Sequence, residues 1–401
     1  VEIEESIYNT VGWESSYTGK QIPQEQMRQW ADSTVEQILA YQPEHVLEIG
    51  CGTGMLLFQI APHCLSYCGT DFSAAALGYV EQQIKQLGES YSHISLSQKL
   101  ADDFTGIEEG RFNAVILNSI VQYFPNIGYL VEVLQGAVKT LSKGGFIFIG
   151  DVRSLPLLET FHAATKFYRA SDSLTVDQLR QQVKNAVNQD EELVIDPAFF
   201  LALKQHLPQI KHVQILLKSG DYHNELTKFR YQVILHVNQE VPSAVIPEWL
   251  DYQKDGLNVS VIAEILADNK PPAIGIKHVP NARLQEDVAL VQELSKSNGR
   301  KTIGQLRNIL HLQKQVGVEP DNLSSLGDQL PYEVYITWSG DGENGCYKAI
   351  FIRNESASGS QRIIPNLEVT SEVKAWSAYA NNPLKRESNR DLVAKQCVVV
   401  G

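Results

Sequence analysis

The hydrophobic pattern of the first 150 residues alternates between short apolar runs and longer amphipathic stretches. The apolar runs at residues 45–49, 112–117 and 146–149 predict buried strands. The stretches at residues 24–40 and 127–141 place apolar residues three and four positions apart, which predicts helices. Strands that alternate with helices at this spacing are typical of parallel βαβ units, so the pattern predicts a doubly wound α/β fold.

The rest of the chain divides into a helical insertion, two further strands and a second unit. Residues 155–205 are more polar and helical, and we expect them to form an insertion or lid between strands of the sheet. Residues 213–218 and 230–237 predict two strands that complete the sheet as an antiparallel pair. We find no internal repeat in the sequence. The expected division is an N-terminal helical lid segment (1–40), a core domain (41–240) and a C-terminal α+β domain (241–401).

Composition and charge argue against several classes of protein. The 401 residues carry a formal net charge of −13 and no run of Lys and Arg, which argues against a nucleic-acid partner. No apolar run approaches the ~20 residues of a membrane span, and the acidic N-terminus is unlike a signal peptide. The five cysteines are odd in number and irregularly spaced, so we expect reduced thiols in a cytoplasmic protein and no metal site. The first residue is not Met, which suggests a piece of a longer protein.

The strongest chemical signal is a glycine-rich turn directly after the strand at residues 45–49. It reads E-x-G-x-G-x-G, with Glu48 two residues before Gly50, and Gly52 and Gly54 following. The glycines allow a tight turn and let a cofactor lie against the backbone. The spacing differs from the G-x-G-x-x-G of dinucleotide enzymes, and an acidic residue here would repel a pyrophosphate. A cofactor with an amino group and a sulfonium, such as S-adenosylmethionine, fits the pattern.

An acidic residue also stands at the end of the second predicted strand. Asp71 lies 17 residues beyond Gly54, and Phe72 and Ser73 follow it. An acidic side chain at this tip can accept hydrogen bonds from both hydroxyls of a ribose, so we expect Asp71 and Phe72 to bind the cofactor. The alternative is that Asp71 or Ser73 only caps the next helix.

Neutral polar residues follow the strand at residues 112–117. Asn118, Gln122 and Tyr123 emerge where the methyl group of such a cofactor would lie, and a neutral polar wall suits a sulfonium. We expect Asn118 and Ser119 to contact the methionine part of the cofactor, and we count Asn118 and Tyr123 among the candidate catalytic residues. The alternative is a capped turn in which Tyr123 belongs to the core.

These motifs, in this order, resemble the class I S-adenosylmethionine-dependent methyltransferases. More closely, they are similar to the methyltransferase domains embedded in nonribosomal peptide and polyketide synthases, over most of the chain. The resemblance implies a mostly parallel, seven-stranded Rossmann-like sheet with a smaller C-terminal α+β domain. It also implies S-adenosylmethionine as cofactor and S-adenosylhomocysteine as product. The matching segments are SYTGKQIP (16–23), LEIGCGTG (47–54), GTDFSAAA (69–76), VILNSIVQYFP (115–125), GDVRSLPLL (150–158), HNELTKFRY (223–231) and YANNPL (379–384).

One departure concerns the end of the matching region. In family members that interrupt an adenylation domain, the segment after Asn-Asn-Pro-Leu leads back into that domain. Here the chain runs only to Gly401, without an adenylating half, so an excised domain and a free-standing enzyme are both open. The partner that the resemblance implies is an acyl or peptidyl carrier protein bearing a phosphopantetheine-tethered substrate.

The resemblance also implies roles for residues after the third strand and between the last two strands. In this class an acidic residue after the third strand receives the adenine amino group, which points to Asp102, with Asp103 as the second choice. The alternative for both is a solvated turn. His223, with Glu225 two residues on, is the candidate general base, because a histidine poised by a carboxylate suits proton transfer at neutral pH. The alternative is a polar hairpin turn.

Five further residues are candidates for shaping the substrate site or for packing around it. Asp151 and Arg153 follow the strand at residues 146–149, and we expect them to contact the substrate. Trp13 and Tyr17 are expected to close over the cofactor or, alternatively, to pack against the first helix. His162, alone in the insertion, is expected to be packed or solvated.

The function expected from these features is methylation of a carrier-bound polyketide or peptide intermediate. The His223–Glu225 pair favours a hydroxyl oxygen as acceptor. The alternative is N-methylation of a carrier-bound aminoacyl group, which near-normal activity of His223→Ala would favour. A remote alternative is a non-catalytic docking module, against which the intact cofactor residues argue. For residues 242–401 we expect a packing or carrier-docking role.

Overall fold

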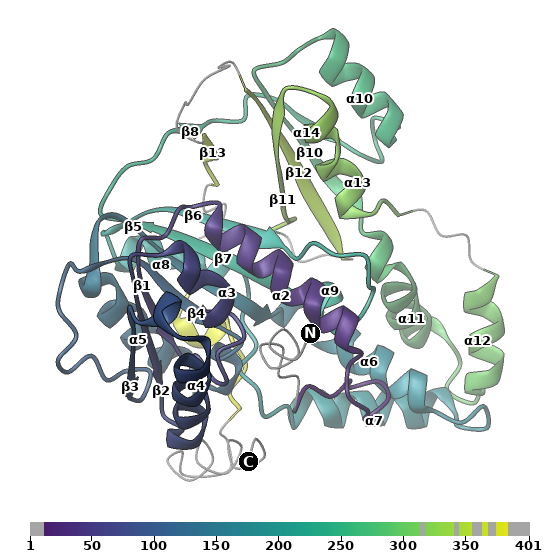
Figure 1. The fold of residues 1–401 in the computed structure, drawn as a ribbon. Coiled ribbons are helices and arrows are strands. Elements are labelled where there is room, and N and C mark those ends of the chain that lie inside the picture. Colours follow the sequence, from purple (N-terminus) through teal and green to yellow (C-terminus); the bar gives the residue numbers. More distant parts are fainter. Residues whose placement is uncertain (1–11, 313–316, 341–344, 355–362, 368–373, 384–401) are drawn as a thin grey trace.

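The computed structural model describes residues 12–312, 317–340, 345–354, 363–367 and 374–383 (Figure 1). Its main feature is a seven-stranded sheet with the order β3-β2-β1-β4-β5-β7-β6. The pairs β5–β7 and β6–β7 are antiparallel and all other neighbours are parallel. The strands are β1 (His45–Ile49), β2 (Ser66–Asp71), β3 (Ile94–Gln98), β4 (Phe112–Asn118), β5 (Leu141–Arg153), β6 (Ile210–Leu217) and β7 (Arg230–Val237). The predicted doubly wound fold with seven strands is confirmed.

Helices cover both faces of this sheet because the inner strands are apolar on both sides. In β1, Val46 packs into one core and the adjacent Leu47 into the other. The first helix, α2, lies across the sheet and buries Met27 and Trp30 (Figure 1). The helices are α2 (Gln24–Leu39), α3 (Leu57–Ile60), α4 (Ala74–Leu87), α5 (Ile127–Thr140), α6 (Leu158–Arg169), α7 (Val176–Asn188), α8 (Ala198–His206) and α9 (Glu225–Lys228).

A second sheet of four strands follows, with the order β11-β12-β10-β9. A two-stranded sheet of β8 (Ser243–Ala244) and β13 (Ile364–Pro365) lies beside it. The other strands are β9 (Trp249–Asp251), β10 (Ala273–Pro280), β11 (Tyr332–Trp338) and β12 (Cys346–Arg353). The helices are α10 (Val259–Asp268), α11 (Gln285–Lys296), α12 (Ile303–His311), α13 (Pro320–Ser324) and α14 (Leu326–Gln329).

The second sheet repeats the topology of the β4-β5-β7-β6 half of the first. In both, a parallel pair (β4–β5, β9–β10) is followed by two antiparallel pairings (β5–β7 and β7–β6, β10–β12 and β12–β11). Both β5 and β10 shift register near their ends, and each shift contains a residue with left-handed backbone angles, Asp151 (φ 65°) and His278 (φ 55°). These two residues are 127 positions apart.

The helices that follow β5 and β10 repeat as well, and they pack against one another. Helices α6 and α7 share an apolar core with α11 and α12. Helices α7 and α12 begin with the same capping box, TVDQLR from Thr175 and TIGQLR from Thr302, again 127 positions apart. Thr175 and Thr302 form an antiparallel bridge with each other, at the centre of the joint between the two copies.

Two arginines close this joint in a reciprocal way. Arg180 on α7 donates to the backbone carbonyl of Leu294 at the end of α11, and Arg307 on α12 donates to that of Phe167 at the end of α6. Each arginine and each carbonyl has its counterpart 127 positions away. The expectation of no internal repeat is therefore wrong for the structure. It failed because, apart from the six-residue cap, the identical side chains of the two copies are scattered, such as the buried pairs Val152/Val279 and Leu157/Leu284.

Across the described ranges, no helix has the length and hydropathy needed to cross a membrane.

We predict that Arg180→Ala and Arg307→Ala lower the free energy of unfolding by similar amounts, about 1–2 kcal/mol each, because each removes charged hydrogen bonds to carbonyls at a helix C-terminus. Urea unfolding followed by circular dichroism measures both changes. Arg300→Ala is the control, since its exposed side chain lies in the turn between α11 and α12. A clear loss at only one of the two positions would contradict the equivalence of the two copies.

Candidate active site

A cavity of about 810 Å³ opens at the carboxyl ends of the central strands. Parallel strands bring their carboxyl ends to one edge of the sheet, so loops far apart in the sequence meet there. The loops after β1 and β2 line one end of the cavity. The loop after β4 lines the middle, and β5, α6 and residues 189–192 line the other end. The N-terminal segment contributes Trp13 and Ser16.

The glycine-rich turn after β1 takes the left-handed backbone that its sequence predicts. Gly50, Gly52 and Gly54 have φ angles of 77°, 52° and 84°. A Cβ at Gly50 would lie 2.4 Å from Ile120, and one at Gly54 would lie 2.7 Å from Phe58, so packing also requires glycine there. A Cβ at Gly52 would meet no atom within 4 Å, because this glycine faces the cavity and leaves its backbone open to a ligand.

Glu48 places a buried carboxylate beside the turn. Its side chain lines the cavity, and the hydroxyl of Tyr67 donates to Oε2 at 2.9 Å. Burial raises the pKa of Glu48 to about 7, although the hydrogen bond from Tyr67 opposes the rise. A buried carboxyl group with a pKa near 7 would be stabilised in its ionised form by a cationic ligand, because the cation would replace the water that burial has removed.

Asp71, at the end of β2, also faces the cavity and is fixed by two backbone donors. The N–H of Gly52 donates to Oδ2 at 2.9 Å and the N–H of Ser73 donates to Oδ1 at 2.8 Å. Burial raises the pKa of Asp71, and these hydrogen bonds oppose the rise. Ser73 caps α4 through its hydroxyl, which accepts from the N–H of Ala76 at 3.2 Å. The helix-capping alternative therefore applies to Ser73, while Asp71 joins the two loops and lines the cavity with Phe72.

These residues fit the cofactor that the sequence predicts. Two carboxylates and an open glycine backbone line one end of a cavity large enough for a nucleoside and an amino acid. Asp102 and Asp103 are not among the residues that line it. The hydroxyl of Tyr129 donates to Asp102 at 2.8 Å, and Lys99 pairs with Asp103 at 3.3 Å. The adenine contact expected of this loop stays a prediction.

The loop after β4 contributes the middle of the cavity wall. Asn118, Ser119 and Tyr123 all line the cavity, as expected. A Cβ at position 150 would lie 1.9 Å from Oδ1 of Asn118, so Gly150 on the neighbouring strand makes room for this side chain. Ser119 has a left-handed backbone (φ 57°), and its hydroxyl donates to Asp151 at 3.0 Å.

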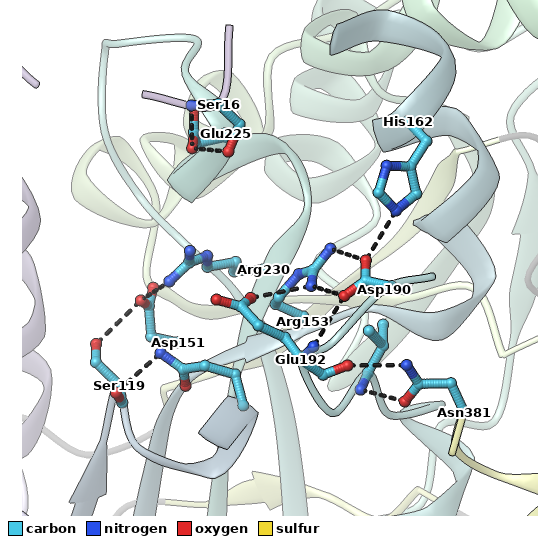
Figure 2. A network of polar contacts seen from close by, with 12 residues as sticks. Ser16, Ser119, Asp151, Arg153, His162, Asp190, Glu192, Glu225, Arg230 and Asn381 are labelled. Atoms are coloured by element: carbon cyan, nitrogen blue, oxygen red, sulfur yellow. Dashed lines mark hydrogen bonds and ion pairs between the residues drawn. The ribbon is translucent and has the colours of Figure 1, made fainter. Parts of the chain in front are cut away.

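Asp151 is fully buried and does not line the cavity, contrary to its expected contact with the substrate. Its carboxylate accepts from Arg230 Nη1 and Ser119 Oγ (Figure 2). It also accepts from Trp30 Nε1 at 3.1 Å and Lys218 Nζ at 3.0 Å. Burial alone would raise the pKa of Asp151, but Arg230 and Lys218 outweigh it and hold the pKa well below its usual range. Each oxygen of this carboxylate already accepts two hydrogen bonds, which leaves none for a substrate. Asp151 therefore connects elements of the fold to one another.

Arg153 does line the cavity, where it organises a cluster that the sequence did not reveal. Its guanidinium forms two hydrogen bonds with Asp190, at 2.8 and 2.9 Å, and one with Glu192 at 2.9 Å (Figure 2). His162 Nε2 lies 2.8 Å from the same Asp190 carboxylate. Burial would raise the pKa of Asp190, but the hydrogen bonds from His162 and Arg153 hold it well below its usual range.

His162, Asp190 and Glu192 were not predicted as site residues. His162 was expected to be packed or solvated, yet it lines the cavity together with both carboxylates. The acidic run Asp190-Glu191-Glu192 carries no motif, and only the fold brings it opposite Arg153. The one available signal was a cluster of three acidic residues directly before a buried apolar run, Leu193-Val194-Ile195.

The expected pair of His223 and Glu225 does not form. His223 is 44% exposed, pairs with Glu319 at 3.2 Å and is not among the residues that line the cavity. Glu225 is buried and accepts from the backbone N–H of Ser16 at 3.0 Å and from its hydroxyl at 2.8 Å. The two side chains diverge because Asn224 between them caps α9, so the chain turns at this point.

Glu225 therefore fastens the N-terminal segment over the cavity. Trp13 lines the cavity and packs against Trp30 of α2, with ring centroids 4.9 Å apart. Tyr17 packs edge-on against Tyr168 of α6 and is not among the lining residues. Trp13 thus combines the two expected positions, over the cavity and against the first helix, whereas Tyr17 joins the N-terminal segment to α6.

Comparisons with known proteins identify relatives over nearly the whole chain. Residues 47–147 match a family model described as "Methyltransferase domain". Chondramide synthase cmdD from Chondromyces crocatus is 39% identical over 393 residues, which is 97% of this chain and 10% of that protein. PF 1022-synthetase from a Rosellinia species is 29% identical over 404 residues, 94% of this chain and 12% of that protein. The chain thus spans about a tenth of the length of these relatives.

A third relative and a solved structure complete the comparison. The probable non-canonical nonribosomal peptide synthetase CymA from Salinispora arenicola is 38% identical over 277 residues, 68% of this chain and 3% of that protein. The N-methyltransferase NodS from Bradyrhizobium japonicum aligns with a TM-score of 0.36 and 16% identity, over 59% of this chain and 97% of that one. A similarity this low adds nothing to the strand order of the sheet, on which the fold assignment rests. The chain belongs to the class I S-adenosylmethionine-dependent methyltransferases and is similar to the methyltransferase domains embedded in nonribosomal peptide synthetases.

Proposed function

We propose that this chain methylates the amine of an aminoacyl group held on a carrier domain, within a synthetase like its relatives. The observation that carries this proposal is the pair of carboxylates, Asp190 and Glu192, at the β5 end of the cavity. Carboxylates at this end suit a substrate that arrives as an ammonium ion, because they pair more strongly with a cation than with a neutral hydroxyl.

The β1–β2 end of the cavity is where we place the cofactor. Glu48 would receive its amino group and Asp71 its ribose hydroxyls, with the Gly52 backbone and Phe72 beside them. When bound, S-adenosylmethionine supplies a methyl group on a sulfonium, which an in-line nucleophile displaces. The order β2-β1-β4-β5 then puts Asn118 between the cofactor and the acceptor.

At the opposite end, we assign binding of the substrate ammonium to Glu192. Its side chain is 32% exposed and only its Oε2 is held by Arg153, whereas the Asp190 side chain is 5% exposed and saturated by Arg153 and His162. Glu192 is therefore the carboxylate of the cluster that a substrate can reach. Arg153 fixes the direction of the Glu192 side chain.

The amine must lose a proton before its lone pair can attack, and we assign this proton to His162. Asp190 is ionised and can only accept, so its contact fixes a proton on His162 Nε2 and leaves Nδ1 as the basic nitrogen. The proton released by the ammonium passes to that nitrogen. The pair of His162 and Asp190 thus takes the place that the sequence had suggested for His223 and Glu225.

Methylation of a hydroxyl is the second candidate function. The observation that favours it is the same His162–Asp190 pair, because a hydroxyl nucleophile needs a general base during attack. The His162–Asp190 pair could act as base for either acceptor. Glu192 is the residue that favours the amine, because its carboxylate would bind an ammonium ion.

The test of the acceptor uses aminoacyl and hydroxyacyl groups loaded on the same carrier domain, with methylated product measured by mass spectrometry. We expect the amine to be methylated, and His162→Ala and Glu192→Gln each to lower kcat/KM by roughly 10²-fold, a typical share for acid–base and positioning groups. His223→Ala is the matched control and should stay within about 2-fold of wild type, since it lies outside the cavity. Methylation of the hydroxyl alone would refute the amine as acceptor.

The raised pKa of Glu48 makes cofactor binding depend on pH. A carboxyl with a pKa of about 7 is mostly protonated at pH 6 and must lose that proton to pair with an ammonium. We therefore expect affinity for S-adenosylmethionine, measured by isothermal titration, to rise roughly 5- to 10-fold from pH 6 to pH 7.5. Proton release should accompany binding at pH 6.5.

The stability of the cofactor-free chain should change with pH in the opposite direction to the cofactor affinity. Because the folded chain holds this proton more tightly than the unfolded chain, the contribution of Glu48 to stability without cofactor falls as pH rises from 4.5 to about 7. Glu48→Gln should abolish both pH dependences, and Asp103→Asn, an acidic residue outside the cavity, should keep them. An unchanged pH dependence of binding in Glu48→Gln would exclude this role.

Two cations at the wall of the cavity fit the phosphate of a phosphopantetheine arm. Lys166 and Arg169 lie three positions apart on α6 and both line the cavity. The double variant Lys166→Ala/Arg169→Ala should raise KM for the carrier-bound substrate roughly 10-fold, as expected for loss of a charged contact. It should leave KM for the N-acetylcysteamine thioester, which lacks the phosphate, unchanged. Lys184→Ala on the exposed side of α7 is the control, and an equal effect on both substrates would exclude the phosphate contact.

A further inference from the structure

The segment that carries Asp190 and Glu192 has no regular secondary structure of its own. It leaves α7 at Asn188 and reaches α8 at Ala198. Its apolar part is fully buried, and Ile195 forms a parallel bridge with Ser154 at the end of β5. This bridge holds one edge of the segment against the main sheet.

The other edge of the segment is held by residues almost two hundred positions later. Ile195 forms an antiparallel bridge with Ala380, and the N–H of Asp196 donates to the carbonyl of Tyr379 at 2.7 Å. Tyr379 is buried and packs edge-on against Phe199 of α8. The last described residues of the C-terminal region thus return to the first sheet and form a short strand-like edge beside the acidic cluster.

Asn381 continues this edge with its side chain. Its Oδ1 accepts from the N–H of Val194 at 2.8 Å, and its Nδ2 donates to the carbonyl of Glu192 at 2.8 Å (Figure 2). The backbone N–H of Asn381 also donates to the carbonyl of Val194 at 3.3 Å. One amide side chain therefore satisfies both a donor and an acceptor of the buried backbone, as a neighbouring strand would.

We propose that Asn381 is a positioning residue for the acceptor, which acts by fixing the backbone from which the Glu192 carboxylate projects. The proposal rests on the proposed role of Glu192. Without the amide, the Glu192 carbonyl and the Val194 N–H lose their partners in a buried setting, and the peptide units that aim the carboxylate are free to rotate. Asn381 does not line the cavity, so its effect reaches the substrate only through this segment.

The primary test compares Asn381→Ala with wild type on the acceptor that the wild type methylates. We expect kcat/KM for the acceptor to fall roughly 10-fold, since small misplacements of a positioning group cost one to two orders of magnitude. The Kd for S-adenosylmethionine should stay within about 2-fold of wild type. Asn258→Ala is the matched control: Asn258 caps α10 through the N–H of Val261 at 3.0 Å, far from the acidic segment. An equal effect of both substitutions, or a parallel loss of cofactor affinity, would overturn the proposal.

A double-mutant cycle separates positioning from general loss of structure. If Asn381 acts through Glu192, Asn381→Ala should cost little more in a Glu192→Gln background, whereas independent effects would multiply. Multiplying effects would overturn the proposal. Should the wild type methylate only a hydroxyl, the proposed function fails, but the cycle on that substrate still reports whether the two residues act together.

Discussion

The structure depends most on the buried carboxylate of Asp151. It lies at the end of β5 in a left-handed conformation and collects hydrogen bonds from α2, from the loop after β4, from β7 and from Lys218 just beyond β6. A buried charge is costly unless it is paired and fully hydrogen-bonded, and here each donor comes from a different element. Asp151 therefore holds the ends of β4, β5, β6 and β7 together at the point where the cavity opens. Trp30, one of the donors, also carries Trp13 over that cavity.

The two ends of the cavity differ in how they are built. The end that we assign to the cofactor is local: the Gly52 N–H donates to Asp71 across one βα unit, and Glu48 belongs to the same motif. The end that we assign to the acceptor is assembled from β5, α6, the segment before α8 and, behind it, Asn381. Its charged groups come from three places: Arg153 from β5, His162 from α6, and Asp190 and Glu192 from the segment before α8. The first end thus depends on contacts between residues close in the sequence. The second end depends on contacts over long sequence distances, so it can vary while the first stays the same.

This difference explains what the sequence could predict. The sheet, the glycine turn and the positions of Glu48 and Asp71 follow from short-range pattern, because the chemistry sits at fixed spacing after apolar strands. His223 and Glu225 are two positions apart, yet their partners, Glu319 and Ser16, are remote and outweigh their proximity in the sequence. The pairing of Arg153 with Asp190 and Glu192 could not be predicted, because no sequence motif fixes the distance between them along the chain. The repeated half-sheet was missed because the identical residues of its two copies are mostly isolated positions, such as Ile149 and Ile276.

The reciprocal joint between the two half-sheet copies has a consequence for how such enzymes can be recombined. Helices α6 and α7, which carry part of the cavity wall, complete their apolar core only with α11 and α12. Arg180 of α7 donates to a carbonyl of α11, and Arg307 of α12 donates to a carbonyl of α6. A transplant of the first helix pair alone would expose one half of a self-complementary surface and leave carbonyls without donors. A transplant of this part of the cavity wall would therefore need all four helices, which come from two separate stretches of the gene.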